Sequence, residues 1–159
     1  MKFSSTLLAV KDMEKSLKFY KEIFKQEVTM DLGWNKTLSC GLVLQSHFDE
    51  LVGFPDENMK WKGYNMELYF ETDDMDEFIA ILEKHPEVEK VHDLKTHDWQ
   101  QRVVRIFDPD GHMIEVGESM EKVAFREFDK GHNLEETQRI TQHPMELVKI
   151  WHEHYLARK

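Results

Sequence analysis

The order of hydrophobic and polar positions along this chain predicts a strand followed by an amphipathic helix, and it does so twice. The first strand is expected over residues 3–10, where the chain is mostly apolar. After this strand in the sequence, apolar residues recur at helical spacing at Met13, Leu17, Tyr20 and Phe24. A second strand is expected over residues 66–72, followed by a helix whose apolar residues are Met75, Phe78, Ile79 and Leu82. The two pairs of elements indicate an internal repeat.

The repeat is visible in the residues at the start of each helix. Residues 10–14 read Val-Lys-Asp-Met-Glu, and residues 72–76 read Thr-Asp-Asp-Met-Asp. We expect Asp12 and Asp74 at the N-caps, because a short carboxylate accepts hydrogen bonds from the free backbone N–H groups of the first helical turn. Glu77 follows Asp74 at the spacing of a capping box.

Three short strands are expected after each helix. They cover about 27–33, 36–41 and 42–46 in the first half, and about 89–96, 101–107 and 112–117 in the second. Asp108-Pro109-Asp110-Gly111 predicts the turn of the last hairpin, because type I turns favour Pro at position i+1 and Gly at i+3. The expected fold is therefore α+β. Two βαβββ modules, over about 3–52 and 65–118, would form a domain over residues 1–119.

These features resemble the vicinal-oxygen-chelate superfamily, which includes glyoxalases, bleomycin-resistance proteins and extradiol dioxygenases. The resemblance rests on the repeated strand–Asp–helix start, on Val10-x-Asp12-x-x-x-Ser16-x-x-Phe19-Tyr20, and on Asp108-Pro109-Asp110-Gly111-x-x-x-Glu115. It covers about residues 3–118 and implies a cleft in which up to four side chains hold a divalent metal. The motifs specify the fold more closely than the activity, since this fold serves several chemistries as well as simple binding.

The resemblance implies four metal-ligand positions, which fall on Ser5, Gln45, Glu67 and Glu115. Ser5 departs from the family pattern, where histidine is common, and no histidine stands at the other three positions. Two carboxylates and an amide oxygen suit Mg²⁺ or Mn²⁺ better than Fe²⁺, Ni²⁺ or Zn²⁺. We therefore expect that the full metal site is missing. A divalent ion held by Gln45, Glu67 and Glu115 stays open, and Glu67 and Glu115 are then the catalytic candidates.

Strand alternation adds residues to the expected cleft. The side chains that would face it together with Glu67 are Tyr69, Glu71, Val103, Arg105 and Phe107. Arg105 is expected beside Glu115. Two roles for Arg105 are open, a partly buried ion pair with Glu115 or a clamp for a substrate carboxylate or phosphate.

Further candidates lie in predicted loops and strand ends. The tryptophans that could stack on a planar ligand are Trp34, Trp61 and Trp99, with core packing as the alternative. The candidate acid–base groups, should they face the cleft, are His92, His97 and His112. Cys40 is the single cysteine and is expected in a buried strand, and a free buried thiol fits a reducing cytoplasm.

Residues 120–159 lie outside the repeat and are expected to form a helical C-terminal extension. One helix is expected over residues 135–142. A second follows His143-Pro144 and carries the apolar stripe Leu147, Ile150, Trp151 and Tyr155, which would pack on the sheet or on a second subunit. The pair looks like a helix-turn-helix. However, the extension has no net charge and the chain as a whole carries −10, so nucleic-acid binding is not expected.

Composition indicates a globular chain, and the family resemblance implies small-molecule chemistry or binding. The chain has 159 residues, 40% of them hydrophobic, and contains no apolar run near the ~18 residues of a membrane span. We expect a cytoplasmic homodimer that binds a small molecule, favouring a flat cation, without the full metal site. The alternatives are a divalent-metal-dependent lyase, isomerase or dioxygenase of the same superfamily, and a DNA-linked regulator that uses the extension.

Overall fold

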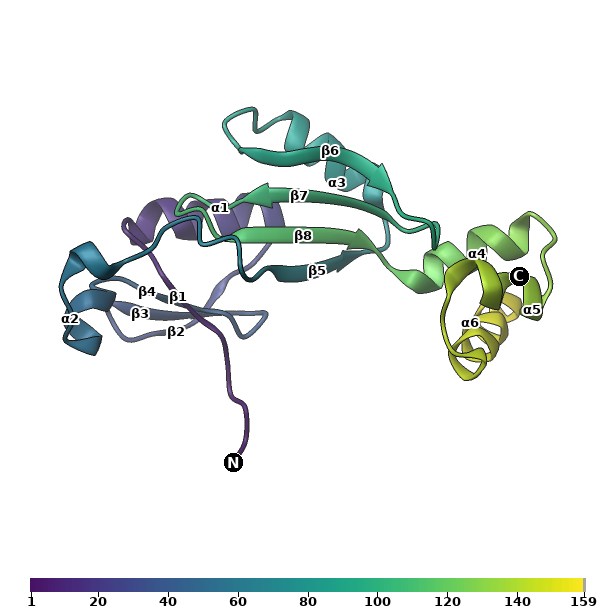
Figure 1. Ribbon diagram of the computed structural model, residues 1–159, viewed down its shortest axis with the longest axis horizontal. Coiled ribbons are helices and arrows are strands. Elements are labelled where there is room, and N and C mark those ends of the chain that lie inside the picture. Colours follow the sequence, from purple (N-terminus) through teal and green to yellow (C-terminus); the bar gives the residue numbers. More distant parts are fainter. Residues whose placement is uncertain (159) are drawn as a thin grey trace. The chain divides into compact units, whose positions relative to one another are not determined.

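The computed structural model describes residues 1–158, in which the βαβββ order occurs twice (Figure 1). The first module consists of β1 (Leu7–Ala9), α1 (Met13–Phe24), β2 (Val28–Asp31), β3 (Asn35–Leu38) and β4 (Val43–Gln45). The second consists of β5 (Leu68–Thr72), α3 (Met75–Glu83), β6 (Lys90–Thr96), β7 (Arg102–Phe107) and β8 (Met113–Glu118). Between them lie α2 (Phe48–Val52) and a short 3₁₀ helix (Asp56–Asn58). The predicted α+β class and the two modules are confirmed.

Each module forms a four-stranded sheet. The strand order is β1-β4-β3-β2 in the first sheet and β5-β8-β7-β6 in the second. In the first sheet β1 runs parallel to β4, with Leu7 opposite Val43, and β3 runs antiparallel to both β4 and β2. The first strand begins at Leu7 instead of residue 3, and all four residues of β2 are exposed.

The residues predicted to start the two repeated helices do so. A side-chain oxygen of Asp12 accepts a hydrogen bond from the backbone N–H of Lys15 at 3.0 Å. Asp74 accepts one from the backbone N–H of Glu77 at 2.8 Å. These bonds satisfy N–H groups that a helix leaves without an internal partner.

The chain divides into two compact units, which are described separately. The first unit consists of residues 1–68, 84–89 and 106–114, and the second of residues 69–83, 90–105 and the chain from 115 onward. Fully buried side chains of the first unit are Tyr20, Leu44, Ile106 and Ile114. Those of the second unit are Met75, Val103, Val104 and Val123.

In the first unit, the turn after β7 is tied to α1 by buried carboxylates. Tyr20 donates its hydroxyl hydrogen bond to Asp108 at 3.0 Å, and Ser16 donates to Asp110 at 3.2 Å. Burial first, and then the charge of Asp108, raises the pKa of Tyr20 well above its ordinary value. Two of the sequence motifs that carry the family resemblance therefore meet in one hydrogen-bonded network that holds the fold together.

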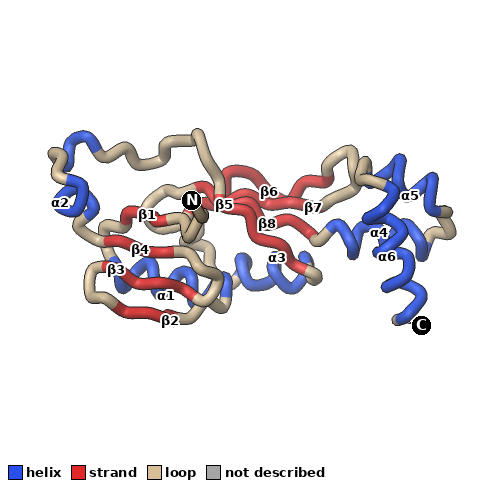
Figure 2. Tube along the Cα trace, turned by 90° about the horizontal axis from the view of Figure 1, so that it is seen from below, coloured by secondary structure: helices blue, strands red, loops and turns tan. Residues whose placement is uncertain are grey.

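The C-terminal extension consists of α4 (Met120–Asp129), α5 (Leu134–Thr141) and α6 (Met145–Ala157), which gather together in Figures 1 and 2. Their buried cluster contains Ala124, Phe125, Phe128, Val148 and Tyr155, with Leu134 and Trp151 packed against it. Trp151 and Tyr155 thus pack within the extension and not on the sheet, whereas packing of the extension on a second subunit stays a prediction. Leu147 and Ile150 of the predicted stripe are exposed, because Val148 occupies the inner face of α6 instead.

Two further expectations need correction. Cys40 is exposed in the turn between β3 and β4 and is not in a buried strand. Helix α4 was not expected, although its signals are in the sequence. Ser119 accepts a hydrogen bond from the backbone N–H of Lys122 at its start, and apolar residues recur along it at helical spacing.

Candidate functional site

Polar side chains of the second unit lie on one face of the second sheet. We call it the polar face. It consists of Tyr69 and Glu71 of β5, Gln101 just before β7, Arg105 within β7, and Glu115 of β8. The intervening residues point the other way, since successive side chains of a strand alternate between faces. Val104 and Val116 on that opposite side are 0% and 2% exposed.

Arg105 and Glu115 form an ion pair on the polar face. The side chain of Glu115 is 9% exposed and that of Arg105 is 24% exposed. Of the two roles that the sequence left open for Arg105, the geometry is that of the ion pair. Because the two charges are opposite and in direct contact, the pair has no net charge and does not favour an anionic or a cationic ligand.

His92 of β6 lies beside this pair. Its Nδ1 is 2.7 Å from the backbone carbonyl of Asp93, and its Nε2 is 3.4 Å from Arg105 Nη1. The Nδ1 of His92 therefore faces a hydrogen-bond acceptor, and its Nε2 faces the guanidinium of Arg105.

At the other end of the polar face, Gln101 joins two aromatic side chains. Its Nε2 donates to the hydroxyl of Tyr69 at 2.9 Å, and its Oε1 accepts from the indole N–H of Trp99 at 2.9 Å. Tyr69 in turn donates to Glu71 at 3.0 Å. Burial, followed by the hydrogen bond to Glu71, raises the pKa of Tyr69 to about 12, so the phenol stays protonated at neutral pH.

Gly117 leaves the space that this network needs. A Cβ placed on Gly117 would lie 2.8 Å from both Gln101 Nε2 and the Tyr69 hydroxyl. Any larger residue would therefore displace the contact between Gln101 and Tyr69. Gln101 and Gly117 were not among the residues predicted for the site. Alternation backward from Arg105 and Val103 places Gln101 on the same face, so the signal for Gln101 was available.

Several predicted site residues lie in the first unit. Trp34 stacks on His47 with ring centroids 4.3 Å apart, and Trp61 lies under the ammonium of Lys11 at 4.2 Å. Phe107 meets the Tyr64 ring edge-on at 5.7 Å. The three tryptophans are thus engaged separately, and Trp99 is the one in the same unit as the polar face.

The remaining acid–base candidates also have their own partners. His97 stacks on Trp99 with ring centroids 4.2 Å apart. His112 Nδ1 lies 2.8 Å from the fully buried carboxylate of Asp108, in the network that holds the turn to α1. His112 is therefore part of the structural network of the first unit.

The family implies a metal site, and the residues present here do not fit one. Gln45 is buried, and both ends of its amide are used: Nε2 donates to the Ser46 carbonyl and Oε1 accepts from Asn35. The charge of Glu115 is matched by Arg105, and Ser5 supplies a hydroxyl where histidine is usual. Across residues 1–158, no group of three or more His, Cys, Asp or Glu side chains is arranged to hold a metal ion.

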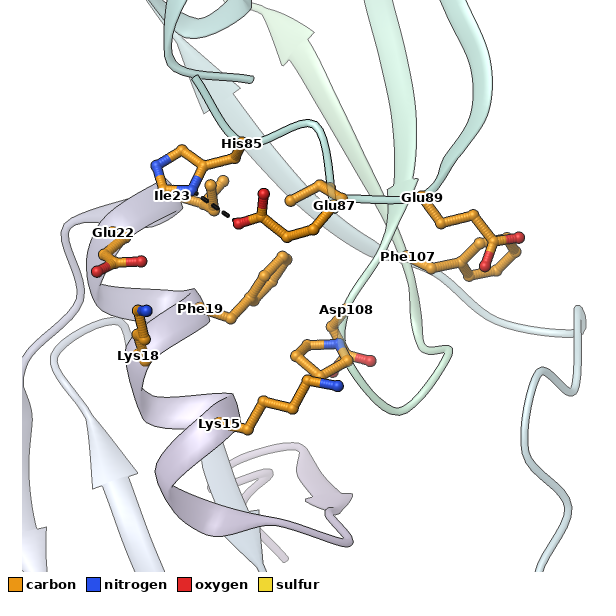
Figure 3. Close-up of a pocket in the computed structure, with 12 residues that line it drawn as sticks. Lys15, Lys18, Phe19, Glu22, Ile23, His85, Glu87, Glu89, Phe107 and Asp108 are labelled. Carbon is orange, nitrogen blue, oxygen red and sulfur yellow. Dashed lines mark hydrogen bonds and ion pairs between the residues drawn. The ribbon is translucent and has the colours of Figure 1, made fainter. Parts of the chain in front are cut away.

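A cavity of about 320 Å³ lies in the first unit, between α1 and residues 85–89 (Figure 3). Phe19 and Ile23 of α1 form apolar walls, and Phe107 contributes from β7. Lysines and glutamates share its rim: the lining includes Lys15, Lys18, Glu22, Glu87 and Glu89. Both signs of charge occur around one small opening, so the cavity does not select a ligand by charge, and we assign it no role.

The comparisons with known proteins agree with this architecture. A family model described as a glyoxalase-like domain matches residues 3–121. The chain belongs to the glyoxalase-like family. The resemblance to the vicinal-oxygen-chelate superfamily is thereby confirmed. A comparison with curated proteins found no match.

Solved structures share the fold of this glyoxalase-like chain. A protein of unknown function from Agrobacterium tumefaciens str. C58 is 34% identical, with 75% of this chain and 94% of that chain covered and a TM-score of 0.61. A glyoxalase-related enzyme from Fulvimarina pelagi is 19% identical over 74% and 88% of the two chains, with a TM-score of 0.61. A lactoylglutathione lyase from Agrobacterium tumefaciens is 24% identical over 77% and 95%, with a TM-score of 0.56. The last two similarities bear on the fold alone.

The helices within residues 1–158 offer no candidate for a membrane span. Within residues 1–158, none combines the length and the apolar composition that a bilayer crossing requires.

Proposed function

We propose that this glyoxalase-like chain binds a small organic ligand on the polar face and does so without a metal. The observation that carries the proposal is the ion pair between Arg105 and Glu115. Glu115 stands where the family resemblance implies a metal ligand, and here its charge is matched by a guanidinium. A second cation at Glu115 would have to compete with a bonded arginine.

The charge that remains on the polar face favours a cationic ligand. Arg105 is neutralised by Glu115, whereas Glu71 is exposed and accepts its hydrogen bond from the neutral phenol of Tyr69. Tyr69 is 49% exposed and Trp99 is partly exposed, so both offer aromatic surface. Aromatic faces attract organic cations by about 0.5–2 kcal/mol each. The proposed ligand is therefore an organic cation that carries an aromatic ring, bound by Glu71, Tyr69 and Trp99.

Titration with matched probes tests this proposal. We expect benzyltrimethylammonium to bind about 5–30-fold more tightly than phenylacetate, the ratio that about 1–2 kcal/mol of cation selectivity gives. The measurement is the change in tryptophan fluorescence at moderate salt. Glu71→Gln should weaken binding of the cation by about 3–10-fold, because an exposed carboxylate contributes about 1 kcal/mol. Glu83→Gln removes an equally exposed carboxylate from α3 and serves as the control.

Two results would contradict the proposal. Tighter binding of phenylacetate, unaffected by Glu71→Gln, would make Arg105 the anchor of an acidic ligand. A large rise in melting temperature with Mn²⁺ or Mg²⁺ that Glu115→Ala abolishes would favour the metal-dependent lyase, isomerase or dioxygenase. In both cases Glu115 or Arg105 would be doing more than neutralising its partner.

We also infer that two copies of the chain associate. Strand β2 is one of the two edge strands of the first sheet, and its residues Val28 and Met30 are 41% and 54% exposed. Exposed edges with apolar side chains are surfaces that proteins usually cover. Light scattering of the full chain should give twice the mass of one chain, and Met30→Lys should reduce it. A wild-type mass of one chain at micromolar concentration would contradict the inference.

A further inference from the structure

Helix α4 contacts the turn of residues 97–101, which contains Gln101 of the polar face. We propose that Arg126 of α4 is a positioning residue for the ligand site, and that it acts through the turn formed by residues 97–101. The proposal rests on the proposed function of the polar face. The family match ends at residue 121, so Arg126 belongs to the extension and not to the matched domain. The extension would thus complete a site that the domain alone leaves loosely held.

Arg126 joins the turn to the end of β8. Its Nη1 donates to Glu118 at 2.6 Å, and its Nη2 donates to the backbone carbonyl of Gln100 at 2.7 Å. Glu118 is 4% exposed on its side chain, so one arm of the guanidinium has a fixed, buried anchor. Because a guanidinium is planar and carries several donors, two such bonds set both the distance and the orientation of what they join.

The residue that Arg126 holds has a strained backbone. Gln100 has a φ of 67°, in the left-handed region that side-chain-bearing residues disfavour. The turn also contains backbone bonds from Gln100 N–H to the His97 carbonyl at 2.8 Å and from His97 N–H to the Gln101 carbonyl at 2.9 Å. Strained conformations persist where the surroundings hold them. The bond from Arg126 ends on the carbonyl of the strained residue, where it restrains the turn most directly.

Gln101 transmits the position of this turn to the aromatic groups. It is 6% exposed, and its amide bonds to the Tyr69 hydroxyl, to the Trp99 indole and to the Glu118 carbonyl, each at 2.9 Å. A shift of the turn therefore moves Gln101, and with it the orientation of Tyr69 and Trp99. Arg126 touches neither aromatic ring in these contacts, so its effect on binding is through position.

The test follows the indole N–H of Trp99 and the affinity for benzyltrimethylammonium in the full chain. ¹⁵N-labelled tryptophans report the indoles separately, and Trp99→Phe assigns the relevant signal. In Arg126→Met we expect the Trp99 N–H to exchange with solvent at least about 10-fold faster and the Kd to rise by about 5–10-fold, since the bond that restrains the Gln100 carbonyl is lost together with the bond to Glu118. Arg126→Lys should recover part of both, because it keeps the charge but not the planar fork.

Two other variants separate positioning from general loss of stability. Arg139→Met removes an exposed arginine from α5 and should change neither readout. Gly117→Ala crowds Gln101 and Tyr69 from β8 and should raise the Kd without touching Arg126. The signals of Trp34 and Trp61 should stay unchanged throughout.

The outcomes distinguish this proposal from the proposed function. An unchanged Trp99 signal in Arg126→Met overturns the positioning role even if the melting temperature falls. A changed Trp99 signal with an unchanged Kd overturns it as well, because Arg126 then supports the turn without serving the site. Failure of the wild-type chain to bind the probe refutes the proposed function, and the Trp99 exchange rate then decides by itself whether Arg126 holds the turn.

Discussion

Replacing Glu118 by alanine is expected to lower the free energy of unfolding by about 2–4 kcal/mol, because it removes a buried carboxylate between two arginines. Glu118 accepts hydrogen bonds from Arg102 at 3.1 and 3.3 Å and from Arg126 at 2.6 Å. Arg102 keeps its hydrogen bond to Asp76 at 2.7 Å in this variant, so the expected loss is smaller than for an arginine left with no carboxylate. Urea denaturation measures the change in the free energy of unfolding. Glu153→Ala, at an exposed position of α6, should cost less than about 0.5 kcal/mol.

The same carboxylate should make the chain sensitive to acid. Burial opposes the charge of Glu118, but the hydrogen bonds from Arg126 and Arg102 together outweigh burial and lower its pKa below the ordinary 4.5. A lowered pKa in the folded state gives stability that is present above pH 4.5 and is lost as the pH falls through the folded pKa. Unfolding curves between about pH 3 and 6 should therefore be less pH-dependent in Glu118→Gln than in the wild type.

Asp110 contributes with the opposite sign. Burial raises its pKa above the ordinary 3.8, so its protonation favours the folded state as the pH falls. The effect of Glu118 is thus read as the difference between the wild type and Glu118→Gln, in which Asp110 cancels. Equal slopes for the two proteins would mean that the arginines do not stabilise the charged form of Glu118.

The fold was predictable because its signals are local and occur twice. Asp12 and Asp74 each begin a helix with an apolar stripe, and each helix is followed by three short runs separated by turns. Such patterns depend on neighbours a few residues away, which a sequence displays directly. Tyr20 and Asp108 show how the motifs extend this to tertiary structure, since they are distant in the chain and bonded in the fold.

The site was less predictable because it depends on which side chains meet. Alternation placed Arg105 beside Glu115 correctly, since it needs only the strand directions. It could not show that Trp34 and Trp61 are engaged by His47 and Lys11, because those contacts arise between loops. The exposure of Cys40 depends likewise on the exact ends of β3 and β4, and strand ends are where sequence patterns are weakest.

Removing Glu115 alone should be costly, and removing it together with Arg105 should not be. Glu115→Ala removes the carboxylate that Arg105 contacts, and because the Arg105 side chain is 24% exposed, the cost should lie near the lower end of the about 3–5 kcal/mol of a fully buried pair. The double variant Arg105→Met with Glu115→Leu should lie within about 2 kcal/mol of the wild type, because apolar side chains of similar volume can replace an ion pair. Chemical denaturation of the wild type, Arg105→Met, Glu115→Leu and the double variant gives the coupling between the two residues.

Measuring the Glu115 variants with and without added metal distinguishes metal-free binding from metal-dependent catalysis. A divalent ion with a Kd of ~1 µM would stabilise the fold by about 4 kcal/mol at 1 mM, and a site built on Glu67 and Glu115 would lose that gain in either alanine variant. We expect instead that Mn²⁺ and Zn²⁺ leave the wild-type melting temperature nearly unchanged. Glu67→Ala and Glu115→Ala should then each change the melting temperature by the same amount with and without added metal. Equal effects of the two variants, both dependent on added metal, would contradict the proposed metal-free site and favour the metal-dependent alternative.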